Sequence, residues 1–304
     1  MTLDPRELYE LDSDRPDLTG TVLVHMMDGF SDAGSAVELA RTHLLQALDG
    51  QVIATFDVDQ LYDYRARRPI MRFARDHWES YAAPELALHL LHDDAGTPFL
   101  LLVGPEPDVQ WERFAQAVGG LVDQLGVRLT LGVNAFPMSM PHTRPTHVIV
   151  HGSRPELFAD YKPWLGTMGV PTSIGHLLEF RLAEGGRDTM GLAATIPPYL
   201  AQSEYPDAAA ALLRQIETRT GLSLPLAALD EAARTTRVAI DKQVEQSSEV
   251  QALVQALEQQ YDSYSRTQED PLVDSDEQLP SADELGAELE RFLAEQARGD
   301  GPAI

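Results

Sequence analysis

A strand–helix–strand succession near the beginning of the chain restricts the fold more than any other feature of the sequence. Residues 21–27 (TVLVHMM) form a short apolar run, which is typical of a buried strand, and residues 51–58 form a second one. Between them, apolar side chains recur on one face of a helix at Val37, Leu44, Leu45 and Leu48. This unit builds parallel sheets, so we predict an α/β protein.

The same alternation continues along the first 225 residues. Further strands are predicted at residues 86–91, 99–103, 127–133, 146–150 and 190–196. Helices are predicted at residues 111–125, 173–183 and 207–220. An arginine-rich segment at 62–69 and a proline-rich segment at 135–145 are predicted as loops. We therefore predict one α/β domain over residues 1–225.

The character of the sequence changes after Pro225. Residues 226–264 contain no proline or glycine and are predicted to be helical. Their apolar residues step by four, three, four and three along a seam: Val250, Val254, Leu257, Tyr261 and Tyr264. Such a seam packs either on its own domain or on another subunit. With a last amphipathic helix predicted at 281–293, residues 226–304 form an acidic helical extension.

Composition excludes several classes of protein. The formal charge is −25, and a surface of that charge repels phosphate backbones and anionic membranes, so we expect neither among the partners. The absence of cysteine excludes disulfides, thiolate catalysis and Cys-ligated metals. No apolar run reaches the roughly 18–20 residues of a membrane span, and residues 1–20 do not have the pattern of a secretory signal. We expect a cytoplasmic protein without a metal or a cofactor.

The turn after the first strand is the first candidate site, because open parallel sheets bind ligands where strands end and helices begin. Its candidate residues are Asp28, Gly29, Phe30, Ser31 and Asp32. The glycines resemble a phosphate-binding loop, but the two carboxylates would repel a phosphate and no lysine follows. Four interpretations stay open: a tight turn with a helix cap, a site for a neutral or cationic ligand, a contact with a protein partner, and a nucleotide site.

The arginine-rich segment is a second candidate, for binding a partner. It carries Tyr62, Tyr64, Arg65, Arg67 and Arg68. Tyrosine and arginine are enriched at the centres of protein interfaces, and guanidinium groups bind carboxylates in pairs of hydrogen bonds. In so acidic a chain these arginines could instead pair with the protein's own carboxylates. Both interpretations are open.

Four further candidate residues lie around later strands. His147 and His151 are separated by an even spacing, which places both on one face of a strand, and two histidines alone favour a structural role. Asn134 and His142 are predicted on the loop after a strand, where functional side chains are common. No nucleophile elbow or zinc-binding motif is present, so we predict no catalytic residue.

Six segments, spread in order between about residue 20 and residue 225, carry a family resemblance. They are residues 25–35 (HMMDGFSDAGS), 56–69 (FDVDQLYDYRARRP), 101–108 (LLVGPEPD), 132–145 (GVNAFPMSMPHTRP), 170–175 (VPTSIG) and 194–205 (ATIPPYLAQSEY). Together they resemble the proteasome assembly chaperone 2 family, in its actinobacterial branch. The resemblance implies a three-layer α/β/α sandwich of the phosphorylase/hydrolase-like kind, with a mixed central sheet and a C-terminal helical extension.

The resemblance also implies a function. Eukaryotic and archaeal relatives assist the assembly of proteasome subunits and self-associate, and the family defines no catalytic residues. Relatives in other branches contact the proteasome through a tail with a hydrophobic–tyrosine–any-residue motif, whereas residues 301–304 read GPAI. We therefore expect a non-catalytic protein that acts in protein assembly or scaffolding. It would bind itself, with a trimer favoured by related folds, and other proteins.

An alternative of another class is kept beside this one. It is a small-molecule-binding protein or a hydrolase/phosphorylase-like enzyme that uses the crevice at the first strand–helix turn. The lining of that crevice would be Asp28, Ser31, Asp32, Asn134 and His142.

Overall fold

A computed structural model describes residues 3–29, 31–163 and 166–269. Phe30, the side chain of Tyr264 and the helix predicted at 281–293 lie outside the described residues and side chains. No described helix combines the length and apolar character needed to cross a membrane.

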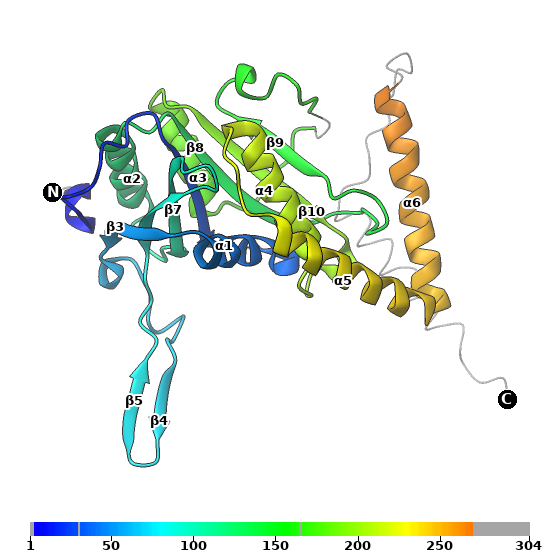
Figure 1. Ribbon diagram of the computed structural model, residues 1–304, viewed down its shortest axis with the longest axis horizontal. Coiled ribbons are helices and arrows are strands. Elements are labelled where there is room, and N and C mark those ends of the chain that lie inside the picture. The colour runs from blue at the N-terminus through cyan, green and yellow to red at the C-terminus, as the bar shows by residue number, and fades with distance from the viewer. Residues whose placement is uncertain (1–2, 30, 164–165, 270–304) are drawn as a thin grey trace.

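One eight-stranded mixed sheet forms the centre of the molecule (Figure 1). In spatial order its strands are β1 (Tyr9–Leu11), β3 (Gly50–Phe56), β6 (Ala87–His92), β7 (Pro98–Pro105), β2 (Val22–Asp28), β8 (Leu129–Pro137), β10 (Thr189–Ile196) and β9 (Val148–Gly152). The four strands β7, β2, β8 and β10 pair in parallel, and all other pairings are antiparallel. β7 and most of β2 are nearly continuous apolar runs because helices bury both of their faces.

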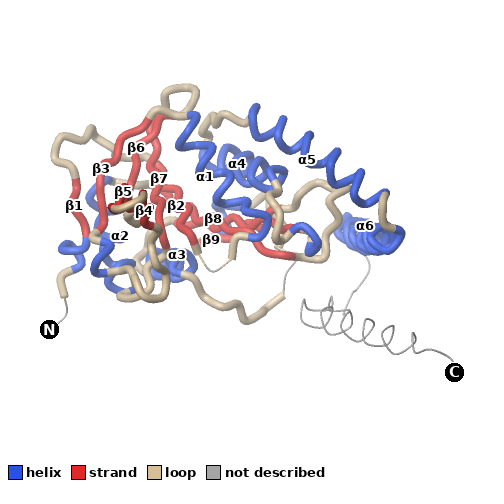
Figure 2. Tube along the Cα trace, turned by 90° about the horizontal axis from the view of Figure 1, so that it is seen from below, coloured by secondary structure: helices blue, strands red, loops and turns tan. Residues whose placement is uncertain are grey.

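Helices cover both faces of the sheet (Figure 2). On one face lie α1 (Ala36–Ala47), α4 (Pro206–Thr220) and α5 (Ala227–Glu245); on the other lie α2 (Trp111–Leu125) and α3 (Ile174–Glu184). Side chains alternate along β2, so that Val22 and Val24 join the core under α1 and α4, whereas Leu23 joins the core under α2 and α3. The predicted three-layer α/β/α sandwich is confirmed.

The pairing of the first two predicted strands differs from that of a simple strand–helix–strand unit. β3 runs in the same direction as β2, but β6 and β7 lie between them. β3 pairs only in antiparallel fashion, with β1 and β6. The antiparallel hairpin β6–β7 fills the gap, and the periodicity of the individual strands does not reveal which strands are neighbours.

A second sheet was not predicted. The segment after residue 69 forms a two-stranded hairpin, β4 (Met71–Ala74) and β5 (His77–Tyr81), that projects from the sandwich (Figure 1). Nearly every residue of both strands is exposed. Without a buried face there is no alternation of apolar and polar residues for the sequence to display.

The end of one strand also differs from the prediction. β8 continues to Pro137, beyond the predicted end at residue 133, because β10 pairs with it as far as Ile196. Asn134 therefore lies within a strand and not on a loop.

The helical extension is broken once. The stretch predicted as uninterrupted helix divides at Gln246 into α5 and α6 (Ser248–Glu269), and the Ser247 side chain accepts the backbone N–H of Val250. Val254 and Leu257 of the predicted seam are buried. α5 packs on α4 and contributes Leu229 and Ile240 to the main core, so the domain boundary at residue 225 stays a prediction.

Candidate functional site

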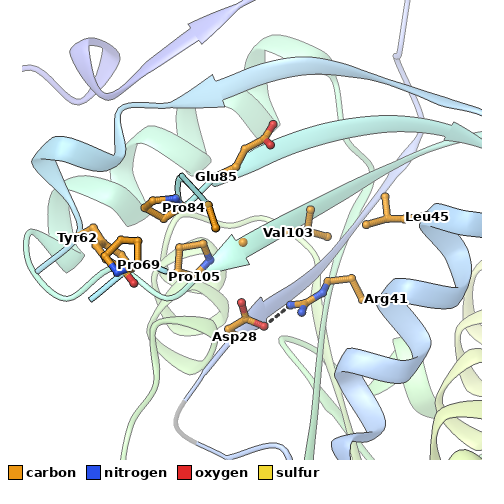
Figure 3. Close-up of a pocket in the computed structure, with 11 residues that line it drawn as sticks. Asp28, Arg41, Leu45, Tyr62, Pro69, Pro84, Glu85, Val103 and Pro105 are labelled. Atoms are coloured by element: carbon orange, nitrogen blue, oxygen red, sulfur yellow. Dashed lines mark hydrogen bonds and ion pairs between the residues drawn. The ribbon is translucent and has the colours of Figure 1, made fainter. Parts of the chain in front are cut away.

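A cavity of about 380 Å³ opens where β2 and β7 end (Figure 3). Asp28 and Gly104 lie at the ends of these strands, Arg41 comes from α1, and Tyr62, Pro69 and Ala82 come from the stems of the projecting hairpin. A smaller hollow of about 220 Å³ shares Asp28 and Arg41 and adds Gly29 and Asp32. The predicted crevice at the first strand–helix turn is therefore present, with the hairpin stems as one wall.

The charges of this crevice pair with each other. The Arg41 guanidinium, 15% exposed, forms an ion pair with Asp28 and donates to the Met26 carbonyl over 3.2 Å. The Asp32 carboxylate accepts the backbone N–H groups of Val37 and Glu38 at 2.8 and 2.9 Å, and burial raises its pKa. Asp32 thus satisfies the donors at the beginning of α1, as a helix cap does.

The rest of the turn is tied to the neighbouring strand. Ser31 donates from Oγ to the carbonyl of Ala135 on β8, at 3.1 Å. Asn134 and His142 do not line the two hollows, so the structure brings together Asp28, Gly29 and Asp32 and separates them from the other two predicted residues. Phe30 lies outside the described residues.

Gly104 fixes where the returning hairpin stem crosses β7. A Cβ at this position would lie 2.2 Å from the Glu85 carbonyl oxygen and 2.6 Å from the Leu86 Cα. Its φ of +133° is also one that other residues rarely adopt. The glycine therefore allows the backbone contact that places the stem at the mouth of the cavity.

The two interpretations of the arginine-rich segment apply to different residues. Arg67 is used internally: its guanidinium pairs with Asp108 at 2.7 Å and lies 4.5 Å from the centroid of the Tyr62 ring. Arg65 and Arg68 are exposed and form no ion pair within the described part of the chain. Tyr64 donates to Asp59 at 2.6 Å, a hydrogen bond that raises the pKa of the phenol to about 12.

Residues 62–82, which we call the arm, expose large apolar side chains. Phe73 and Trp78 are 55% and 63% exposed and contact each other edge to face, with ring centroids 5.0 Å apart. The other exposed apolar residues of the arm are Ile70, Met71 and Tyr81. Such a surface is unusual for a side of a protein that faces only water.

His142 belongs to the contact with the helical extension. It is buried, and its ring nitrogens lie 2.6 Å from the Tyr199 hydroxyl and 3.1 Å from Asp241 of α5. Next to it, Arg144 pairs with Asp262 and Glu258 of α6. The predicted proline-rich loop therefore holds α5 and α6.

Asn134 lies on the opposite face of the sheet, under α3, where it donates from Nδ2 to His176 Nε2 at 2.8 Å. Beside this pair, His151 of β9 is hydrogen-bonded to Glu179 of α3 at 3.1 Å. His25 of β2 is buried at the same place. We call these five residues the α3 cluster. His147 lies just before β9 and contacts Tyr161 instead.

The titratable groups of the α3 cluster are shifted in both directions. Burial lowers the pKa of His25 to about 4 and also lowers that of His176. Burial opposes a charge on His151 too, but the hydrogen bond and charge of Glu179 outweigh it and raise the pKa of His151. No group of three or more potential metal ligands occurs among the residues that the structure describes.

Sequence reasoning missed three members of the α3 cluster: His25, His176 and Glu179. A signal was present in Gly132 and Gly191, because a glycine inside a buried strand often marks the close approach of another group. Which groups approach them depends on β2, β9 and α3, which are far apart in the sequence.

The comparison with known families is decisive, because residues 26–244 match the model described as the PAC2 family. The chain belongs to the PAC2 family. This match begins in β2 and ends in α5, so the cavity, the arm and the α3 cluster apart from His25 lie inside it in this PAC2-family protein.

Solved structures agree with this assignment. A Mycobacterium tuberculosis protein of unknown function is 46% identical, with 88% of this chain and 94% of that chain covered and a TM-score of 0.82. A PAC2 family protein from Streptomyces avermitilis is 29% identical, with 77% and 99% covered and a TM-score of 0.68.

A Mycobacterium tuberculosis homologue of proteasome-assembly chaperones is 24% identical, with 77% and 100% covered and a TM-score of 0.71, and shares the fold. A search of curated proteins found no match.

Proposed function

We propose that this PAC2-family protein is a non-catalytic, self-associating protein that acts in protein assembly or scaffolding, and that the arm binds a second copy of the chain. The observation that carries the proposal is the exposed apolar surface of the arm, with Phe73 and Trp78 at its centre. The trimer expected from the resemblance is the proposed assembly.

The energetics of the hairpin support an intermolecular role. A two-stranded hairpin alone in water is only marginally stable, and β4 and β5 bury no face against the sandwich. Burial of apolar surface stabilises an interface by about 25 cal/mol per Å², and aromatic residues are the commonest anchors of such interfaces. A protein surface that covers Phe73 and Trp78 would stabilise both the arm and the complex.

Charge favours a second copy as the occupant. The arm contains five arginines and three carboxylates, in a chain whose formal charge is −25. The rest of the molecule is therefore strongly acidic, and it attracts a locally basic arm from another subunit. Arg65 and Arg68 are exposed on the arm and available for such contacts.

The assembly role is supported by the family. The chain belongs to the PAC2 family, and a protein with the same fold is a homologue of proteasome-assembly chaperones. An assembly factor needs surfaces that bind proteins, and the arm is one. The crevice offers less support for the alternative, a ligand-binding or hydrolase-like protein, because Asp28 is paired with Arg41, and Asn134 and His142 lie elsewhere.

Sedimentation velocity at micromolar concentration tests self-association through the arm. We expect the full chain to sediment as an oligomer, and the double variant Phe73→Ser/Trp78→Ser to sediment as a monomer with an unchanged far-UV circular dichroism spectrum. The matched control is Phe180→Ser, which removes an aromatic side chain that is 56% exposed on α3, outside the arm. A monomeric wild-type protein, or equal dissociation of the control, would contradict the proposal.

A further inference from the structure

The α3 cluster is built on one row of residues that crosses four strands. In the register of the sheet, His25 of β2 lies beside Gly132 of β8, which lies beside Gly191 of β10, which lies beside His151 of β9. Two histidines thus flank two glycines along one line across the sheet. Because neighbours in such a row share a face, all four positions face α3.

The glycines provide the space that the imidazoles occupy. A Cβ at position 132 would lie 2.6 Å from His25 Cε1. A Cβ at position 191 would lie 2.1 Å from His151 Nε2 and 2.8 Å from the Glu179 carboxylate. All three distances are shorter than van der Waals contact, so the two rings lie directly over the glycine backbones.

α3 closes this space from above. His176 and Glu179 are three residues apart and therefore lie on one face of the helix. His176 is hydrogen-bonded to Asn134, and Glu179 to His151. On its neighbouring face, Ile174, Leu178 and Leu182 pack in the core shared with α2. α3 is thus held to the middle of the sheet by apolar contacts, and to β8 and β9 by its hydrogen bonds with Asn134 and His151.

His25 is placed so that it cannot accept a proton without a rearrangement. Its side chain is almost completely buried, and its Nε2 atom has no hydrogen-bond partner among the described residues. Its neighbours in the register are Leu102 of β7 and Gly132 of β8, which carry no charge. A buried charge without a partner or water is strongly unfavourable.

Two charged or titratable groups act on His25, namely Glu179 and His176 of α3. The carboxylate of Glu179 already serves His151, and a proton on His176 would repel one on His25. The cluster therefore has one anionic group for three imidazoles. Additional protons become stable only when water reaches the rings.

We propose that α3 covers the cluster and is released at low pH. Protonation of His25 and His176 detaches α3 from β8, β10 and β9 while the sheet itself stays folded. α3 is the element whose displacement hydrates both rings, because His176 lies on it and Gly175 lies next to His25. A Cβ placed on Gly175 would lie 3.3 Å from His25 Cε1. Displacement of α3 separates Glu179 from His151 and exposes the row of His25, Gly132, Gly191 and His151 on the sheet.

The direction of the pH dependence follows from the shift of His25. Its pKa is about 4 in the closed state and has the ordinary value of about 6.5 when the ring is hydrated. The closed state is therefore fully favoured above pH 6.5 and loses stability as the pH falls toward 4. Between pH 7.5 and pH 5.5, His25 alone raises the equilibrium constant for opening about tenfold. The lowered pKa of His176 acts in the same direction, and the raised pKa of His151, which loses Glu179 on opening, acts against it.

Hydrogen exchange followed by mass spectrometry tests the proposal, after correction for the intrinsic pH dependence of amide exchange. In the wild-type protein, we expect protection of the α3 amides to fall about tenfold between pH 7.5 and pH 5.5, while protection of β10 stays constant. In His25→Gln the α3 response should become much smaller, with only the part that comes from His176 remaining. The matched control His89→Gln removes a half-buried histidine of β6, outside the cluster, and should keep the wild-type response.

Three results would overturn the proposal: constant protection of α3 in the wild-type protein, an unchanged pH response in His25→Gln, and equal loss of protection in β10, which would indicate global unfolding. Should His25→Gln fail to fold, His25→Met provides a second neutral side chain for the same comparison.

Discussion

At β10, the two faces of the central sheet are equally buried but differ in chemistry. All eight of its residues are buried. Met190, Leu192, Ala194 and Ile196 face α4 and the main core. The residues that alternate with them, Thr189, Gly191, Ala193 and Thr195, are small or polar and face the side of α3.

This difference separates two kinds of stabilisation. Under α1 and α4, interlocking apolar side chains hold the layers together, and their contribution is almost independent of pH. Under the polar side of α3, a few hydrogen bonds and imidazoles hold the helix, and their contribution depends on protonation. One face thus secures the fold, and the other provides an element that responds to its surroundings.

The largest expected effect comes from adjacent residues of β8 that face opposite sides. Leu131 is fully buried in the main core, and we expect Leu131→Ala to lower the free energy of unfolding by about 3 kcal/mol through the lost contacts and the cavity. Thr130→Val is the matched change on the other face. The Thr130 hydroxyl has no hydrogen-bond partner among the described residues, so its removal should be neutral or stabilising.

Urea denaturation of both variants at pH 7.5 measures this difference. Similar losses for Leu131→Ala and Thr130→Val would contradict the contrast between the faces. A loss confined to Leu131→Ala would sharpen it.

The next largest effect concerns the space under α3. We expect Gly191→Ala to cost about 2 kcal/mol, because the new methyl group overlaps His151 and Glu179 and must displace them. Gly120→Ala is the control: it lies on the exposed side of α2 with no atom within 4 Å, and alanine stabilises a helix by up to about 1 kcal/mol. Thermal unfolding of the two variants should shift in opposite directions.

Loss of stability in Gly191→Ala should be accompanied by loss of the pH response of α3. If this variant kept both the wild-type stability and that response, the glycine row would not be what positions the cluster.

The strands and their apolar residues were predictable from the sequence, and the polar residues gathered under α3 were not. Residues 99–103 are a continuous apolar run, and this strand was found because burial on both sides leaves such a run. The strand at residues 190–196 was found from Met190, Leu192, Ala194 and Ile196, which alternate with the small or polar residues of its other face. Asn134 was identified as a candidate but placed on a loop, since Pro137 and the residues after it suggested an early strand end. The α3 cluster combines β2, β8, β9 and α3, and no local pattern reveals such a combination.

The arm and the extension show the same limit. The composition of residues 62–69 identified an unusual segment, but β4 and β5 bury nothing in the sandwich, so no periodicity marked them as strands. The division between α5 and α6 occurs at Gln246 without a glycine or proline, and it depends on how each helix packs.

The smallest expected effect comes from a surface ion pair next to α3. Its removal tests whether such ion pairs, and not the α3 cluster, hold α3 on the sheet. Arg187, just after α3, pairs with Asp123 of α2 through two hydrogen bonds, of which the one from Nε measures 2.8 Å. These contacts raise the pKa of Arg187 and lower that of Asp123. Asp123 is 61% exposed, so solvent and salt screen the pair.

We therefore expect Arg187→Gln to lower the free energy of unfolding by less than about 1 kcal/mol, and 0.5 M salt to abolish most of that difference. Urea titrations at low and high salt measure both quantities. The pH response of α3 should be the same as in the wild-type protein, because Arg187 does not take part in the cluster's hydrogen bonds. A variant that lost this response would show that α3 is held from its end and not by the imidazoles under it, and the contrast between the two faces would then need another cause.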